Sequence, residues 1–157
     1  MQKDCLKRKA WFEKKGISNI FVCFESNLSE VPSNTWWLDS GATTHVSNVM
    51  QGFLTIQSIN PNENFLFMGN RMKAPIEGIW IYRVVLDFGH HLDLFQILYV
   101  PSFSRNLVSL SKLDVLGFSF KFGHGCFNLY DKHDSVIGSG ILVDGLYKLK
   151  LNVDFSA

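Results

Sequence analysis

One acidic residue of this sequence stands in a setting suited to catalysis. Asp39 directly follows the apolar residues 36–38, and the small residues Ser40 and Gly41 come next. A short strand would fix the Asp39 carboxylate, Gly41 would let the backbone approach closely, and the Ser40 hydroxyl could hydrogen-bond across to a partner loop. The tripeptide therefore makes Asp39, Ser40 and Gly41 candidate catalytic residues.

The chemistry of such an aspartate requires a second carboxylate. Two facing carboxylates cannot both ionise, because the like charges raise the pKa of one of them, and the pair then shares one proton. One carboxylate draws a proton from a bound water while the other protonates the substrate carbonyl. The sequence holds a single Asp-Ser/Thr-Gly, so an aspartic peptidase would take its second Asp39 from a second copy. An isolated Asp-Ser-Gly is more often an ordinary turn.

Other kinds of chemistry find little support in the sequence. The cysteines Cys5, Cys23 and Cys126 form no Cys-x-x-Cys pair, and the five histidines show no metal-ligand spacing. We therefore expect no disulfide framework and no metal site. Neither a glycine-rich phosphate loop nor a Gly-x-Ser-x-Gly nucleophile elbow is present. The sequence predicts no cofactor.

Composition and charge describe a globular chain with a basic arm. Of the 157 residues, 46% are hydrophobic and 18% charged, which excludes a disordered protein and suits one domain. No apolar run reaches the ~18 to 20 residues of a membrane-spanning helix, and the N-terminus is too polar for a signal peptide, so we expect a soluble, intracellular protein without membrane contact. Residues 1–16 carry six basic and two acidic side chains. This arm predicts weak nucleic-acid contact or, as charge alone favours, a solvated leader.

Short apolar runs separated by turns predict an all-β protein. The polar linker 25–35 separates an apolar run at 17–24 from the body of the chain. Strands at this spacing are typical of a barrel or a sandwich. The predicted strands of the body are 36–38, 65–68 and 74–88 around the hairpin signal Gly69-Asn70, 94–100 before Pro101, 118–122, 126–130, 135–137, 141–143 and 146–151.

One segment has helical rather than strand periodicity. Within residues 104–116, leucines recur at every third position from Leu107 to Leu113. Ser104 is a suitable N-cap and Gly117 a suitable residue just past the helix end. The pattern predicts one short amphipathic helix docked against the β-structure.

Three separated motifs carry a family resemblance. WLDSGATTHVS at 37–47, LYVPSFSRNLVSLSKL at 98–113 and DGLYKL at 144–149 resemble, in this order, the Pol polyprotein of copia-type long-terminal-repeat retrotransposons. The corresponding region of that family is a retropepsin-like aspartic protease. The resemblance implies a closed β-barrel of retropepsin type, active as a homodimer, that cleaves the Gag-Pol polyprotein as its peptide substrate. Asp39 would be the catalytic aspartate, with Ser40 and Gly41 completing its signature.

The same resemblance divides the chain. Residues 1–16 resemble the basic remnant of a Gag zinc-knuckle tail, in which only Cys5 of the zinc site survives, so no zinc is expected. Residues 17–35 would be a linker with one strand, 36–151 the retropepsin-like barrel and 144–157 the start of a pre-integrase segment. A virus-like particle in the cytoplasm is the implied location, with the nucleus as the alternative.

Some features of the sequence leave alternatives open. The family often has glycine where Arg71 and Trp80 stand, and both 56–68 and 65–82 are candidates for the hairpin that covers the substrate. The strands after residue 118 either complete the barrel or belong to a downstream domain. A catalytically inactive, truncated β-barrel remnant that serves as an interaction module is the alternative to a protease. A nucleic-acid-binding accessory built on the basic arm ranks last.

Overall fold

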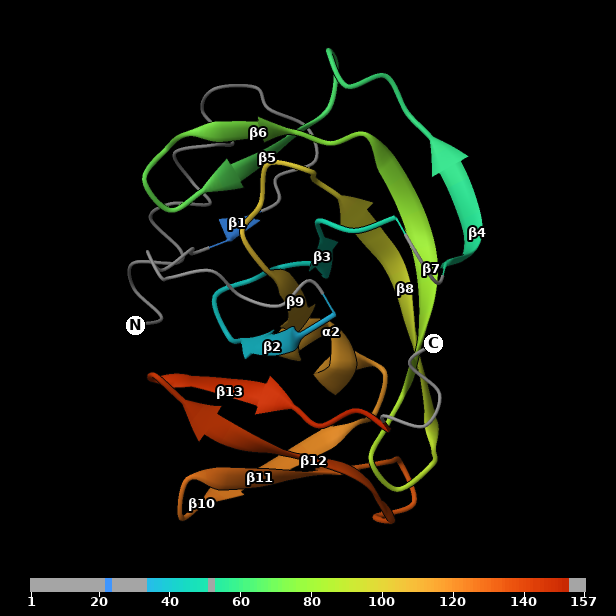
Figure 1. The fold of residues 1–157 in the computed structure, drawn as a ribbon, viewed down its shortest axis with the longest axis vertical. Coiled ribbons are helices and arrows are strands. Elements are labelled where there is room, and N and C mark those ends of the chain that lie inside the picture. The colour runs from blue at the N-terminus through green and yellow to red at the C-terminus, as the bar shows by residue number, and fades with distance from the viewer. Residues whose placement is uncertain (1–21, 24–33, 51–52, 153–157) are drawn as a thin grey trace.

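The computed structural model describes residues 22–23, 34–50 and 53–152 (Figure 1). These residues form strands in two sheets and one short helix, and none of the described helices is long and apolar enough to cross a membrane. The elements are β1 (Val22–Cys23), β2 (Trp36–Asp39), β3 (Val46–Ser47), β4 (Phe53–Ser58), β5 (Phe65–Met68), β6 (Lys73–Pro75), β7 (Gly78–Val85), β8 (His91–Tyr99), β9 (Asn106–Ser109), α2 (Leu110–Val115), β10 (Ser119–Gly123), β11 (Cys126–Tyr130), β12 (Val136–Val143) and β13 (Leu146–Leu149).

The larger sheet is open, so the predicted closed barrel is wrong for the part of the chain that the structure describes. Its ten strands run in the order β10-β11-β12-β13-β2-β9-β3-β8-β7-β4, and no pairing joins the two ends. The reason is that β13 pairs with β2, with Tyr147 opposite Leu38, and the C-terminal strands extend the sheet beyond it. Figure 1 shows these strands as a layer beside β2 and α2, with the long β7–β8 hairpin on another side. The all-β class with one short helix is confirmed.

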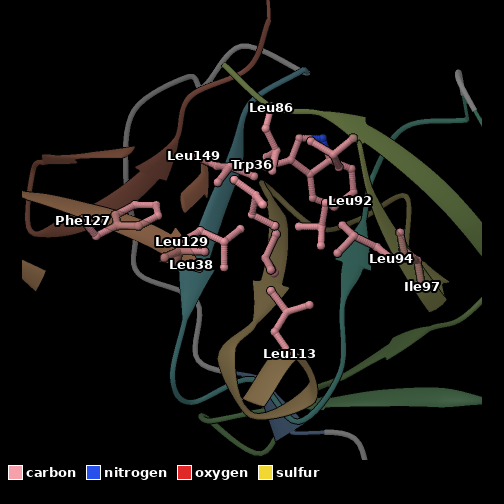
Figure 2. Packing of buried hydrophobic residues seen from close by; sticks show 13 residues of the cluster. Trp36, Leu38, Leu86, Leu92, Leu94, Ile97, Leu113, Phe127, Leu129 and Leu149 are labelled. Atoms are coloured by element: carbon pink, nitrogen blue, oxygen red, sulfur yellow. The ribbon is translucent and has the colours of Figure 1, made fainter. Parts of the chain in front are cut away.

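The strand that carries Asp39 lies in the middle of this sheet and is buried on both faces. β2 pairs in parallel with β9, and Trp36, Trp37 and Leu38 are all buried. Because side chains alternate along a strand, Trp36 and Leu38 enter one hydrophobic cluster and Trp37 enters another. Figure 2 shows the first cluster, in which Trp36 and Leu38 pack with Leu113 of α2. Burial on both faces therefore fixes the backbone that leads into Asp39.

The helix is shorter than the predicted one at 104–116. Residues Asn106–Ser109 form β9 instead, and α2 spans Leu110–Val115 with Ser109, not Ser104, as its N-cap. The leucine spacing was misleading because β9 is a central strand whose residues are all buried, and such strands lack a polar face. Gly117 follows the C-cap residue Leu116 with a φ of +94°, which confirms its predicted place past the helix end.

The hairpin predicted at Gly69-Asn70 is confirmed. β5 and β6 are antiparallel, with Phe67 opposite Lys73, and form the smaller sheet together with β1. The apolar run predicted as one strand at 74–88 is divided between β6 and β7. Of the apolar run at 17–24, only β1 lies within the described residues.

The C-terminal strands pack on the same core as β2. Phe127, Leu129 and Leu149 are buried in the cluster that holds Trp36 and Leu38 (Figure 2). The turn between β7 and β8 adds a polar link, because the Asp87 carboxylate accepts hydrogen bonds from the backbone N–H and the hydroxyl of Ser139 in β12. The sequence left open whether the strands after residue 118 belong with the strands before them. In the structure they lie in the same sheet as β2 and share its hydrophobic cluster.

Gly138-Ser139-Gly140 lies inside β12, which joins the two strands predicted separately at 135–137 and 141–143. A Cβ atom added at Gly138 would contact the side chain of Leu86, and one added at Gly140 would overlap the Phe127 ring and the Lys148 carbonyl. Glycine at these two positions therefore lets neighbouring parts of the chain pack closely against β12, which explains why glycine occurs within this strand.

Gly140→Ala is expected to destabilise the fold by about 3 kcal/mol, because overpacking a filled core forces side chains and backbone apart. The matched control is Gly123→Ala, where an added Cβ meets nothing within 4 Å and a surface change of about 0.5 kcal/mol or less is expected. Urea unfolding of both variants measures the difference. Equal midpoints for the two variants would contradict the packing described here.

Candidate active site

Asp39 is the last residue of β2, at the point where the chain leaves the core. It is half-buried, Ser40 beside it is exposed and Gly41 is half-buried. The Gly41 backbone N–H donates a hydrogen bond to Asp39 Oδ1 at 2.7 Å. The structure therefore places the three predicted residues in one tight turn, in which a backbone donor orients the Asp39 carboxylate.

The turn that follows Asp39 is closed by Ser109 of β9. Asp39 and Ser109 are register partners in the parallel pair of β2 and β9. The Ser109 hydroxyl donates to the Ala42 carbonyl at 2.7 Å, and the Ser109 backbone N–H donates to His45 Nδ1 at 3.0 Å. Ser109 is fully buried and also caps α2 by accepting a hydrogen bond from the Lys112 N–H. One side chain thus joins the Asp39 turn, β9 and the helix.

His45 is a buried neutral imidazole. It is 1% exposed, and burial, with a smaller contribution from the nearby Lys112 ammonium, lowers the pKa of His45 from 6.5 to about 3. Because Nδ1 accepts the Ser109 N–H, the ring proton of the neutral form is on Nε2. The sequence predicted no role for His45, because the five histidines show no metal-ligand spacing. Its position within the motif 37–47 was the one available signal.

A β-bulge brings a third element to this turn. The register of β7 and β8 shifts between Trp80 and Tyr82, and Gln96 in the bulged strand has a φ of +53°. The Gln96 carbonyl accepts a hydrogen bond from Thr44 Oγ1 at 3.4 Å, and Gln96 Oε1 accepts one from Lys112 Nζ at 3.3 Å. Bulges and left-handed non-glycine residues are concentrated next to functional sites. Sequence patterns give no signal for this contact.

Asn106 anchors the start of β9. Its Oδ1 accepts hydrogen bonds from Ser47 Oγ at 3.0 Å and from the Asn48 N–H at 3.1 Å, while its Nδ2 donates to the Thr35 carbonyl at 3.1 Å. The helix predicted at 104–116 includes Asn106, whereas the structure places this residue at the start of β9, the strand beside β2. Its buried amide holds together the segments that enter and leave the candidate site.

Known proteins show which family this chain resembles. The family described as "Pol polyprotein, beta-barrel domain" matches residues 36–118, which is more than half of the chain. The chain belongs to this family. The match includes Asp39, His45 and Ser109 but ends before β10, so the four C-terminal strands of this Pol beta-barrel domain lie outside it.

A curated relative points to the same origin. The "Retrovirus-related Pol polyprotein from transposon RE1" of Arabidopsis thaliana is 29% identical over 122 residues, which are 76% of this chain and 8% of the relative. This Pol beta-barrel domain thus spans a small part of the relative's length. No solved structure matches it significantly. The two matches confirm the predicted copia-type retrotransposon Pol region.

Proposed function

We propose that this Pol beta-barrel domain is an aspartic endopeptidase that cleaves retrotransposon polyprotein, with one Asp39 from each of two copies. The observation that carries the proposal is the placement of Asp39. A strand buried on both faces delivers its carboxylate to the surface, and the Gly41 N–H orients that carboxylate. Membership of the Pol family supplies a polyprotein context for the substrate.

In the proposed reaction the two Asp39 carboxylates share one proton. The ionised carboxylate takes a proton from a bound water, which attacks the peptide carbonyl, and the protonated carboxylate gives its proton to the carbonyl oxygen. Ser40 is exposed next to Asp39, so its hydroxyl is accessible to a second copy. The tetrahedral intermediate then collapses and its C–N bond breaks: the carboxyl group that took the proton from water gives it to the leaving amine, and the other carboxylate takes the proton of one hydroxyl, which leaves one proton on the pair.

The proposed substrate is an extended segment of polyprotein, which binds by pairing with strand edges. Of the two segments considered from sequence, 65–82 contains a hairpin with an exposed tip. The β5–β6 hairpin ends in a turn where the Met72 N–H donates to Asn70 Oδ1, and Met72 is 60% exposed. We assign this hairpin as the element that covers the substrate.

The test is cleavage of a Gag-Pol-derived polypeptide by the full chain, with products identified by mass spectrometry. Asp39→Asn keeps the shape of the side chain but removes the acid and base, so cleavage should fall about 10³-fold or more. Asp114→Asn, an exposed aspartate on α2, is the matched control and should cleave normally. Sedimentation equilibrium with a pepstatin-like inhibitor should show a dimer that forms with the inhibitor and is lost in Asp39→Asn.

Two results would count against this function. Cleavage that persists in Asp39→Asn would place the activity elsewhere, or in a contaminant. A folded chain that stays monomeric with the inhibitor and cleaves nothing would match the alternative function, an inactive β-barrel that serves as an interaction module.

A further inference from the structure

The turn that begins at Asp39 is held at its start, its middle and its end by Ser109. The start is the register pairing of Asp39 with Ser109, and the middle is the hydrogen bond from the Ser109 hydroxyl to the Ala42 carbonyl. The end is the hydrogen bond from the Ser109 N–H to His45 Nδ1. In the first two contacts the turn takes part through its backbone, whereas in the last it takes part through a side chain, the His45 ring.

The backbone of His45 is fixed on its other side by β8. The His45 carbonyl accepts a hydrogen bond from the Leu98 N–H at 3.0 Å, and the preceding Thr44 donates to the Gln96 carbonyl. His45 therefore lies between β8 and β9, with its main chain bonded to one strand and its ring bonded to the other. If the His45 ring moved, the end of the turn would lose its hydrogen bond to Ser109, the residue opposite Asp39.

The contact at His45 requires an unprotonated Nδ1. Ser109 is fully buried and His45 is 1% exposed, so water cannot replace the imidazole as the acceptor for the Ser109 N–H. A protonated ring would direct an N–H group at that N–H. The charged group that acts on the ring is Lys112 of α2, whose Nζ bonds to Gln96 of β8, and its positive charge also favours the neutral imidazole.

We propose that His45 is a positioning residue for Asp39: its neutral imidazole, bonded to the Ser109 N–H, holds the turn that orients the Asp39 carboxylate. This inference rests on the proposed endopeptidase function insofar as it concerns the reaction. His45 does not touch the reacting atoms. It acts through Ser109 and through the turn that contains the Gly41 N–H.

Two polar substitutions, made in the whole 157-residue chain, separate this role from a general packing role. His45→Asn places the amide oxygen near the position of Nδ1, where it can accept the Ser109 N–H without titrating. His45→Gln places its oxygen near the position of Nε2, away from Ser109. We expect His45→Gln to lower kcat for the polyprotein peptide about 30-fold with little change in KM, since misplacing a catalytic group by about 1 Å costs up to about 100-fold. His45→Asn should stay within about 3-fold of the unchanged chain.

Amide hydrogen exchange gives a readout that does not depend on cleavage. In His45→Gln we expect faster exchange of the Ser109 N–H and of the Gly41 N–H that binds Asp39, and in His45→Asn we expect both to be protected. This exchange pattern would support the positioning role of His45 even if no form of the chain cleaved peptide. Absence of cleavage would refute only the proposed endopeptidase function. Unchanged Gly41 exchange in His45→Gln overturns the inference, and so does a loss of kcat or protection in His45→Asn as large as that in His45→Gln.

Discussion

A chain that ends at Phe118 will fail to fold, although it contains every residue of the family match from Trp36 onward. β13 is the neighbour of β2 on the side away from β9, so truncation leaves one edge of the Asp39 strand without a partner. The truncation also removes four buried side chains of the cluster that contains Trp36 and Leu38: Phe127, Leu129, Ile137 and Leu149.

The size of the loss decides the outcome. Burial of each of these side chains contributes about 2 kcal/mol, and their removal exposes the apolar surfaces of Trp36 and Leu38 in addition. The sum, about 8 kcal/mol or more, is comparable to the whole stability of a small domain, about 5 to 15 kcal/mol. The folded unit therefore extends through the C-terminal strands, beyond the segment by which the family is recognised.

Urea unfolding of two chains, residues 1–118 and residues 1–152, is the measurement. We expect a cooperative transition followed by near-UV circular dichroism for the longer chain and none for the shorter one. Addition of a separate peptide of residues 119–152 to the shorter chain should restore part of the near-UV signal. A cooperative transition of the shorter chain by itself would show that the C-terminal strands are an accessory to the fold.

The Asp39 turn could be predicted from the sequence because its signals are local. An apolar strand, an acidic residue and two small residues follow one another, and the structure places them in one tight turn. The β5–β6 hairpin and most C-terminal strands could be predicted for the same reason, because the alternating apolar residues and the turn residues that indicate them lie within a few positions of each other.

Other features depend on contacts between distant segments, which no local pattern contains. β9 looked like the first half of a helix because pairing with β2, some 70 residues earlier, is what makes it a strand. The openness of the sheet follows from the pairing of β13 with β2, which joins opposite ends of the described chain. The contacts of Ser109 with Ala42 and His45 likewise cross more than 60 residues, and periodicity carries no information at that range.

Acid is expected to destabilise the folded chain through His45. In the unfolded chain this histidine has its ordinary pKa of 6.5, whereas burial first, and the Lys112 charge second, lower its pKa to about 3 in the fold. Between these two values the unfolded state binds a proton that the folded state does not, so the free energy of unfolding falls as the pH is lowered from about 6.5 to 3. The linkage relation gives a loss of about 3 kcal/mol between pH 7 and pH 4.

Urea unfolding at a series of pH values, for the unchanged chain and for His45→Asn, isolates this contribution. The carboxyl groups of Asp93 and Asp131 also have lowered pKa values, from hydrogen bonds to Arg83 and to the Ser135 backbone respectively, so their contribution to stability is lost mainly below the ordinary pKa of an aspartate in an unfolded chain, about 4. The decline between pH 6.5 and 4.5 should therefore disappear in His45→Asn and remain in the unchanged chain. The same decline in both chains would assign acid sensitivity to another group.

The same titration limits the pH range of the proposed reaction. The proposed reaction needs one protonated and one ionised Asp39, and mild acid favours this singly protonated pair over two ionised carboxylates. The fold that positions Asp39 has the opposite preference, because the hydrogen bond from Ser109 to His45 needs a neutral ring. We therefore expect cleavage to reach its maximum in the mildly acidic range. Its acid limb should follow the unfolding of the chain and move to lower pH in His45→Asn; an acid limb at the same pH in both chains would assign it to the dyad alone.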